Sequence, residues 1–107
     1  MKLPHRGEVW LVDLGLAAKI RPCLVVGAPA AGDDRVIATL VPHTTSLRGT
    51  QYEVPVPVPF LRAGAFDAQG IVTVPAVRLM RLMGTLRPEQ MNAVHGGICL
   101  WLGLKAS

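Results

Sequence analysis

The sequence has few cysteines, few aromatic residues and no long hydrophobic run. Cys23 and Cys99 are its only two cysteines, and they lack the spacing of a zinc site or a redox pair. Because both lie in apolar runs, we expect buried, reduced thiols and no disulfide framework. No apolar run approaches the ~20 residues that span a bilayer, and the first ten residues lack a signal peptide's apolar stretch. We therefore expect a soluble, cytoplasmic protein without membrane contact.

Common cofactor and catalytic motifs are also missing. The chain contains no glycine-rich dinucleotide fingerprint, no Walker loop, no HExxH metal motif and no GxSxG nucleophile elbow. These absences disfavour most cofactor-dependent and metal-dependent enzymes. We therefore expect no bound cofactor and no metal.

Length and charge suggest a single basic domain. The 107 residues, half of them hydrophobic, fit one domain spanning 1–107 with its own core. Eleven lysines and arginines against seven acidic residues give a net charge of +4. Arginine, with its planar fork of donors, is the commoner cation, which favours nucleic acid or an acidic protein as the partner.

Hydrophobic patterning predicts a mainly β fold with one terminal helix. Short β-rich runs occur at 7–13, 20–26, 36–41, 71–77 and 81–86. In the last run Gly84 would fit a bend or bulge. Apolar residues then recur at helical spacing over 88–102, although Gly96 and Gly97 weaken that helix by roughly 1 kcal/mol each. The expected architecture is a small, bent sheet or open barrel capped by the helix.

The segment 52–59 alternates valine with proline. In a strand, prolines at every second position all lack an N–H on the same edge, so that edge cannot pair with a neighbouring strand. The pattern therefore predicts an edge strand. The alternative is a polyproline-like connector.

Arg21 and the tract 42–46 are the candidate site. Arg21 lies inside an apolar run, where a permanent charge must be paired or kept at the rim of the sheet. The tract Pro42-His43-Thr44-Thr45-Ser46 places three hydroxyls and an imidazole near Arg48. A guanidinium can stabilise the added negative charge of a pentacovalent phosphorus, while hydroxyls donate to its oxygens. The alternative is an ordinary hydrogen-bonded turn.

An ordered set of motifs resembles the MazF/PemK family of toxin endoribonucleases of type II toxin–antitoxin systems. These motifs are Arg6-Gly7-Glu8-Val9-Trp10, Arg21-Pro22 followed by an aliphatic strand, Pro42-His43-Thr44-Thr45-Ser46, Tyr52-Glu53-Val54, Gly70-Ile71-Val72, Arg78 and Leu82-Met83-Gly84-Thr85-Leu86 before the helix.

The resemblance implies a small SH3-like barrel with a C-terminal helix that forms a homodimer and cuts single-stranded mRNA at short sequences without metal, as a sequence-selective endoribonuclease. In that family the RP arginine and the first PxTT threonine act together at the scissile phosphate, and they match Arg21 and Thr44. The RNA 2′-hydroxyl is the nucleophile and leaves a 2′,3′-cyclic phosphate and a 5′-hydroxyl. An acidic cognate antitoxin neutralises the toxin.

The sequence departs from the family pattern at the first loop, which is short (15–20) and lacks the usual polar segment. The residue that acts as general base is therefore unassigned. By their positions in the motifs, the candidates are the imidazole of His43 and the carboxylates of Glu8 and Asp13. We predict Arg21, Thr44 and His43 as catalytic residues. The residues predicted to contact RNA are Thr45, Ser46, Arg48, Arg78 and Trp10. Two alternatives remain: a degenerate relative that only binds RNA or antitoxin, and an SH3-like protein-interaction module.

Overall fold

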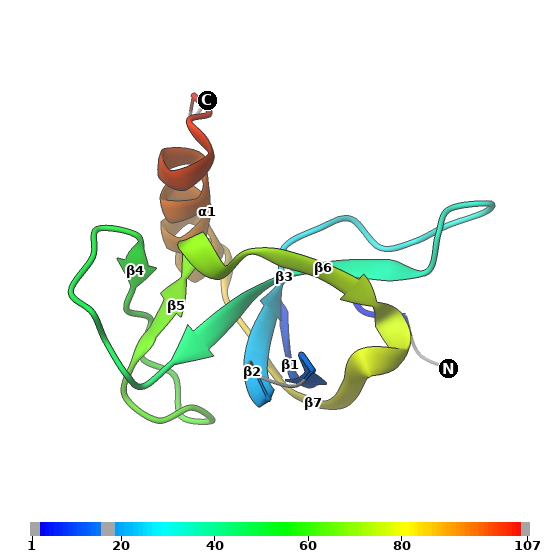
Figure 1. The fold of residues 1–107 in the computed structure, drawn as a ribbon, viewed down its shortest axis with the longest axis horizontal. Coiled ribbons are helices and arrows are strands. Elements are labelled where there is room, and N and C mark those ends of the chain that lie inside the picture. Colours follow the sequence, from blue (N-terminus) through cyan, green and yellow to red (C-terminus); the bar gives the residue numbers. More distant parts are fainter. Residues whose placement is uncertain (1–2, 16–18, 106–107) are drawn as a thin grey trace.

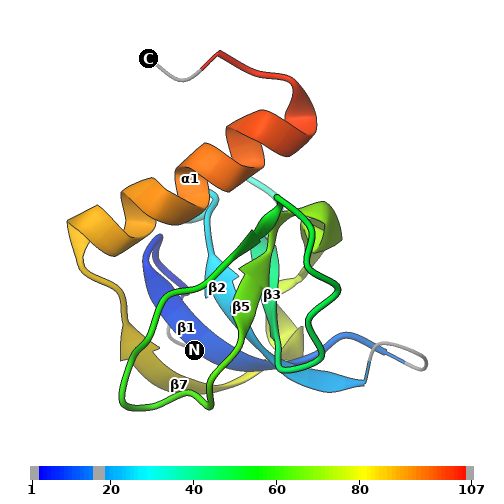
Figure 2. The same cartoon turned by 90° about the vertical axis from the view of Figure 1, so that its left-hand side faces the viewer.

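The computed structural model describes residues 3–15 and 19–105, which form a bent antiparallel sheet with one helix packed across it (Figure 1 and Figure 2). The strands are β1 (Glu8–Asp13), β2 (Ile20–Val25), β3 (Ile37–Thr44), β4 (Glu53–Val54), β5 (Ala65–Asp67), β6 (Val72–Pro75) and β7 (Leu79–Thr85). The helix is α1 (Pro88–Leu102), and two 3₁₀ turns, η1 (Ala68–Gly70) and η2 (Ala76–Arg78), flank β6. The expected mainly β fold with a terminal helix is confirmed.

The strands follow the order β4-β5-β3-β2-β1-β7, and β6 pairs with the first half of β3. Among the described residues β7 pairs only with β1, so the SH3-like barrel is open. The pairs Val9↔Gly84 and Trp10↔Leu82 leave Met83 as an extra residue on β7, which confirms the bulge expected at Gly84.

The predicted edge strand at 52–59 is wrong in extent. Only Glu53–Val54 forms a strand, and 55–59 is the connector given as the alternative. Three prolines in five residues remove the donors that a continued ladder would need, although Val56 is still buried. β4 does lie at the edge of the sheet, as expected. The short strand β5 was not predicted.

The sheet buries a hydrophobic cluster on each face because neighbouring side chains in a strand point in opposite directions. Val9, Leu24 and Val41 belong to one cluster, which α1 and the segment 54–61 cover. Trp10, Val12 and Cys23 belong to the other. With much of both faces occupied by these clusters, the polar side chains of β2 and of the second half of β3 lie at the strand ends.

Helix α1 has the predicted bounds. Pro88 is its first residue, the Arg87 N–H donates to Gln90 Oε1 at 2.8 Å, and Gly103 ends it with φ +69°. The two glycines inside the helix differ in their surroundings. A Cβ on Gly97 would lie 2.7 Å from Val54 Cγ2, whereas a Cβ on Gly96 would meet no atom within 4 Å. Gly97 therefore permits close packing of α1 on β4. No helix in the described ranges is long and apolar enough to cross a membrane.

The two glycines should respond oppositely to alanine. Gly97→Ala should lower the free energy of unfolding by about 1–3 kcal/mol, because its methyl group overpacks Val54. Gly96→Ala, the matched control, should raise it by about 0.5–1 kcal/mol through helix propensity. Urea unfolding followed by circular dichroism measures both. Equal effects of the two substitutions would contradict the packing role of Gly97.

Candidate functional site

A hollow of about 630 Å³ opens beside the ends of β2 and β3, and we call it the threonine hollow. The residues that line it include Arg21, Pro42, Thr44, Ser46, Arg48, Thr50, Glu53, Asp67, Gln69 and Trp101. They come from β2, β3, the loop 45–52, β4, β5, η1 and the end of α1. The sheet thus gathers at one rim side chains that are far apart in the sequence.

Strand register explains why Arg21 and Thr44 share this hollow. Strands β2 and β3 pair as Leu24↔Val41 and Cys23↔Pro42. The same antiparallel register, continued by two residues, places Arg21 opposite Thr44 and on the same face of the sheet. Arg21 is exposed at this strand end, as a permanent charge on an otherwise apolar strand requires.

The Thr44 hydroxyl also organises the turn that follows β3. Its Oγ1 accepts a hydrogen bond from the Ser46 N–H at 3.0 Å and lies 3.4 Å from the Ser46 carbonyl oxygen, to which it donates. The hydrogen-bonded turn given as an alternative is therefore present. The two interpretations are compatible, because this half-buried threonine still lines the hollow.

Glu53 holds the loop that forms one wall of the threonine hollow. Its Oε1 accepts hydrogen bonds from the N–H groups of Gly49 at 2.7 Å and Thr50 at 3.0 Å. The Arg48 N–H donates to both carboxylate oxygens, at 2.9 and 3.2 Å. These bonds, led by the one from Arg48, hold the pKa of Glu53 below its ordinary value. A charged Glu53 thereby fixes Arg48 at the hollow.

A second hollow of about 430 Å³ lies beside the same strand ends, and we call it the histidine hollow. Its lining residues are Lys19, Ile20, Arg21, Pro22, His43, Thr45, Phe60, Leu61, Arg62 and Met83. The His43 ring is 4% exposed and packs edge-on against Phe66, with ring centres 5.0 Å apart. Burial lowers the pKa of His43 and so favours the neutral form of the ring.

The structure separates the predicted catalytic residues into two groups. Arg21 and Thr44 line the threonine hollow with the predicted RNA contacts Ser46 and Arg48. His43 lines the histidine hollow instead, because it precedes Thr44 in the strand. The predicted RNA contact Thr45 lies with it. Arg21 is the one predicted site residue that lines both hollows.

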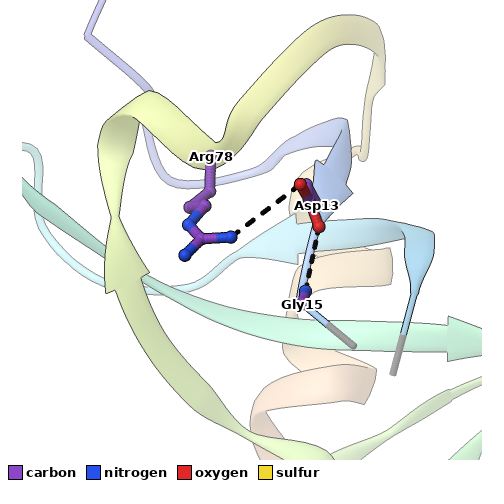
Figure 3. Close-up of polar contacts among 3 residues, drawn as sticks. All are labelled: Asp13, Gly15 and Arg78. Carbon is purple, nitrogen blue, oxygen red and sulfur yellow. Dashed lines mark hydrogen bonds and ion pairs between the residues drawn. The ribbon is translucent and has the colours of Figure 1, made fainter. Parts of the chain in front are cut away.

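Two predicted RNA contacts lie in neither hollow. Trp10 is 8% exposed and belongs to the core, where its Nε1 donates to Glu8 Oε1 at 3.1 Å. Arg78 pairs with Asp13, Nη1 to Oδ2, at 3.8 Å, and Asp13 Oδ1 accepts from the Gly15 N–H at 2.9 Å (Figure 3). Glu8 and Asp13, the carboxylates given as candidates for the general base, thus lie outside both hollows and bond to Trp10 and Arg78.

Several lining residues could not be predicted as members of a site. Asp67, Gln69 and Trp101 reach the threonine hollow through unpredicted β5, η1 and the last turn of α1. Arg62 reaches the histidine hollow from the loop between β4 and β5. Their positions depend on tertiary packing, and no local spacing reveals them.

The cysteines behave as expected from their apolar surroundings. Cys23 and Cys99 are both free and buried, and desolvation raises the pKa of Cys23 to about 12. Cys99 Sγ lies 3.4 Å from His95 Nε2 on the same helix. Over residues 3–15 and 19–105, no group of three or more histidine, cysteine or acidic side chains could hold a metal ion.

Comparison with known proteins identifies relatives along nearly the whole chain. A family model described as the PemK-like, MazF-like toxin of type II toxin–antitoxin systems matches residues 5–102. The chain is 32% identical over 95 residues to the probable endoribonuclease MazF5 of Mycobacterium tuberculosis (strain ATCC 25618 / H37Rv), covering 86% of each protein.

Solved structures agree with this assignment. A mycobacterial endoribonuclease in complex with its cognate antitoxin is 26% identical with a TM-score of 0.80, over the whole of both chains. The Mycobacterium tuberculosis toxin MazF-mt6 is 27% identical with a TM-score of 0.78, over 92% of this chain and 99% of that one.

Glu53→Gln should loosen the loop 48–50 because the neutral amide is a weaker acceptor for its three N–H groups. Amide exchange at Gly49 and Thr50, measured by NMR, should become faster. Glu89→Gln, which removes only a surface ion pair with Arg87, is the control and should leave these amides unchanged.

Acid should lower the protection factors of the same loop amides in the unmodified protein. Because the pKa of Glu53 is lowered in the folded state, its contribution is complete above the ordinary value of 4.5 and is lost as pH falls through the lowered pKa. Protection factors of the loop amides that are unchanged in the Glu53→Gln variant, or unchanged at low pH after correction for the intrinsic exchange rate, would contradict the role of Glu53.

Proposed function

Because this chain belongs to the PemK-like, MazF-like toxin family of type II toxin–antitoxin systems, we propose that it is an endoribonuclease that cuts single-stranded mRNA in the cytoplasm. A relative that is 32% identical is named a probable endoribonuclease. The observation that carries the proposal is that Arg21 and Thr44 line the same open hollow. Arg48 adds a second positive charge to that hollow.

In the proposed reaction the RNA 2′-hydroxyl attacks the adjacent phosphorus. Arg21 stabilises the added negative charge of the pentacovalent phosphorus, while Thr44 and Ser46 donate hydrogen bonds to its oxygens. The 5′-oxygen leaves and takes a proton, which gives a 2′,3′-cyclic phosphate and a 5′-hydroxyl. Arginine supplies the charge stabilisation, so this mechanism needs no metal.

The proton of the 2′-hydroxyl needs an acceptor. His43 faces the other hollow, and Glu53 is committed to the loop 48–50. Asp67 also lines the threonine hollow and uses Oδ1 to cap η1, accepting from the Gln69 N–H at 3.1 Å. We propose the remaining oxygen of Asp67 as the acceptor.

An acidic antitoxin is the proposed protein partner. One similar toxin was solved in complex with its cognate antitoxin. A carboxylate-rich segment offers Arg21 and Arg48 the same kind of acceptor as an RNA backbone. We therefore propose that antitoxin and RNA compete for the threonine hollow.

A relative that binds RNA without cutting it is the second candidate. Two observations favour it: the short first loop at 15–20, and the engagement of the Thr44 hydroxyl in its own turn. Residues 16–18 of that loop lie outside the described ranges. A cleavage assay on the purified protein separates the two candidates.

The proposed enzyme should depend on Arg21. Arg21→Ala should slow cleavage of single-stranded RNA by about 100- to 1,000-fold, because a preorganised charge at the transition state is lost. Arg35→Ala, an exposed arginine outside both hollows, should cleave at the normal rate. Single-turnover cleavage with circular dichroism as a folding check measures both. Full activity of folded Arg21→Ala would refute the mechanism.

We also propose a homodimer that buries the end of α1. Leu100, Trp101, Leu102 and Leu104 form a run of large hydrophobic residues, and each is at least 41% exposed. Four exposed large apolar side chains at one end of a helix, on an 11.4 kDa chain, are typical of a segment that a second copy covers.

Light scattering at micromolar concentration should give twice the mass of one chain. Leu102→Lys should shift this mass toward the monomer because a charge would enter the apolar contact. Lys105→Glu is the control beside the cluster and should leave the mass unchanged. A monomeric unmodified protein would refute the dimer.

A further inference from the structure

We propose that the histidine hollow binds one nucleobase of the RNA strand, and that it selects the keto bases guanine and uracil over adenine and cytosine. The proposal rests on the proposed function, because it places this base next to the phosphate held at Arg21. It adds a determinant of cleavage specificity on the other side of β3 from Thr44.

Arg21 connects the two hollows. It lines both of them, and it is the one described residue that their linings share. A phosphate bound at Arg21 carries a nucleoside on each side, so an adjacent base lies within reach of the histidine hollow. Unstacked bases of single-stranded RNA are available for such binding, and proteins commonly read them in this form.

The hollow has a rigid apolar wall that suits the flat face of a base. The Phe60 ring lies against Gly84, where an added Cβ would be 2.4 Å from Cε1 of the ring. The His43 ring is held between Phe66 and the backbone at Gly64, where an added Cβ would be 2.9 Å from His43 Cε1. Both rings are therefore fixed by close contacts. His43 is buried and supports the wall from behind, whereas the half-buried Phe60 ring is the aromatic surface on which a base can stack.

The polar groups of the hollow are mainly donors. Lys19, Arg62 and the Thr45 hydroxyl line it, and none of the carboxylates in the described part of the chain does. Lys19 has φ +59°, and is the one described residue other than glycine with positive φ. Its backbone is held there by hydrogen bonds with Gly15 and Leu14, of 2.7 and 2.9 Å.

A donor-rich pocket favours a base edge with carbonyl oxygens. Guanine offers O6 and N7, and uracil offers O4, as acceptors for a guanidinium or ammonium group. Adenine and cytosine present an amino group at the corresponding position, which would face another donor. Arg62 is the best candidate reader, since its fork can donate two parallel hydrogen bonds to guanine.

The experiment compares short single-stranded RNAs that carry a 2′-deoxy substitution at the cleaved nucleotide, so that they bind without being cut. The cut site is first read by sequencing the products of a random RNA pool. Guanine, inosine, adenine, uracil and cytosine are then placed in turn at each position flanking the cut, and binding is measured by fluorescence anisotropy. Inosine keeps the O6 keto group of guanine but lacks its 2-amino group, so it tests recognition of the keto group without that amino group.

At one flanking position, the unmodified protein should prefer guanine, inosine and uracil by about 5- to 150-fold over adenine and cytosine. Arg62→Ala should remove most of this preference, and Arg62→Lys should restore it only in part, because an ammonium group lacks the planar fork of the guanidinium. Arg35→Ala is the matched control and should keep the full preference.

Equal weakening of all the RNAs by Arg62→Ala, with recovery in Arg62→Lys, would mean that Arg62 contacts phosphate and would overturn the proposal. An unchanged preference in Arg62→Ala would also overturn the proposal. So would binding of an acidic peptide to this hollow when no base binds there. If the unmodified protein cuts no RNA in the pool, the proposed enzyme fails. The same binding series, with each position of one fixed RNA sequence varied in turn, then still decides the base pocket.

Discussion

The pairing of β2 with β3 is the constraint on which both hollows depend. Its register, Cys23↔Pro42 and Leu24↔Val41, is fixed by side chains that are buried on opposite faces of the sheet. A slip by one residue would turn both sets of side chains to the wrong face. The same register decides which polar groups beyond the paired residues share a face. Arg21 and Thr44 share a hollow because the buried hydrophobic residues that follow Arg21 in β2 and precede Thr44 in β3 set this alignment.

Burial on both faces also explains where polar chemistry can be placed. In a small domain with two hydrophobic clusters, a charged side chain is tolerated only where it reaches water, as at the end of a central strand. Arg21 and Thr44 lie at such ends, and the loop after β3 brings Ser46 and Arg48 beside them. Glu53, from an edge strand of two residues, keeps this loop in place. Stability and site geometry are therefore supplied by different residues.

The sequence was sufficient for features that depend on local patterns. The spacing of apolar residues and the proline at its start predict helix α1. The apolar runs around Arg21 and before Pro42 predict two of the central strands. The sequence was insufficient for features that depend on packing between residues far apart in the chain. Strand β5 is three residues long, and Trp10, which resembles an exposed binding aromatic in the sequence, is drawn into the core. The opposite orientations of His43 and Thr44 follow from β3 extending to Thr44, beyond the expected 36–41. Had that extension been foreseen, strand alternation would have separated the two residues.

The prolines that follow β4 have a consequence for the protein at high concentration. An exposed sheet edge offers unpaired N–H and C=O groups to any passing chain, and it is the usual starting point for aggregation. Here the edge strand is only two residues long, and Pro55, Pro57 and Pro59 follow it without a single N–H among them. A further strand finds too few partners to extend the ladder at this end. Resistance to edge-to-edge aggregation, as the toxin accumulates, is thus built into the same segment that covers its core.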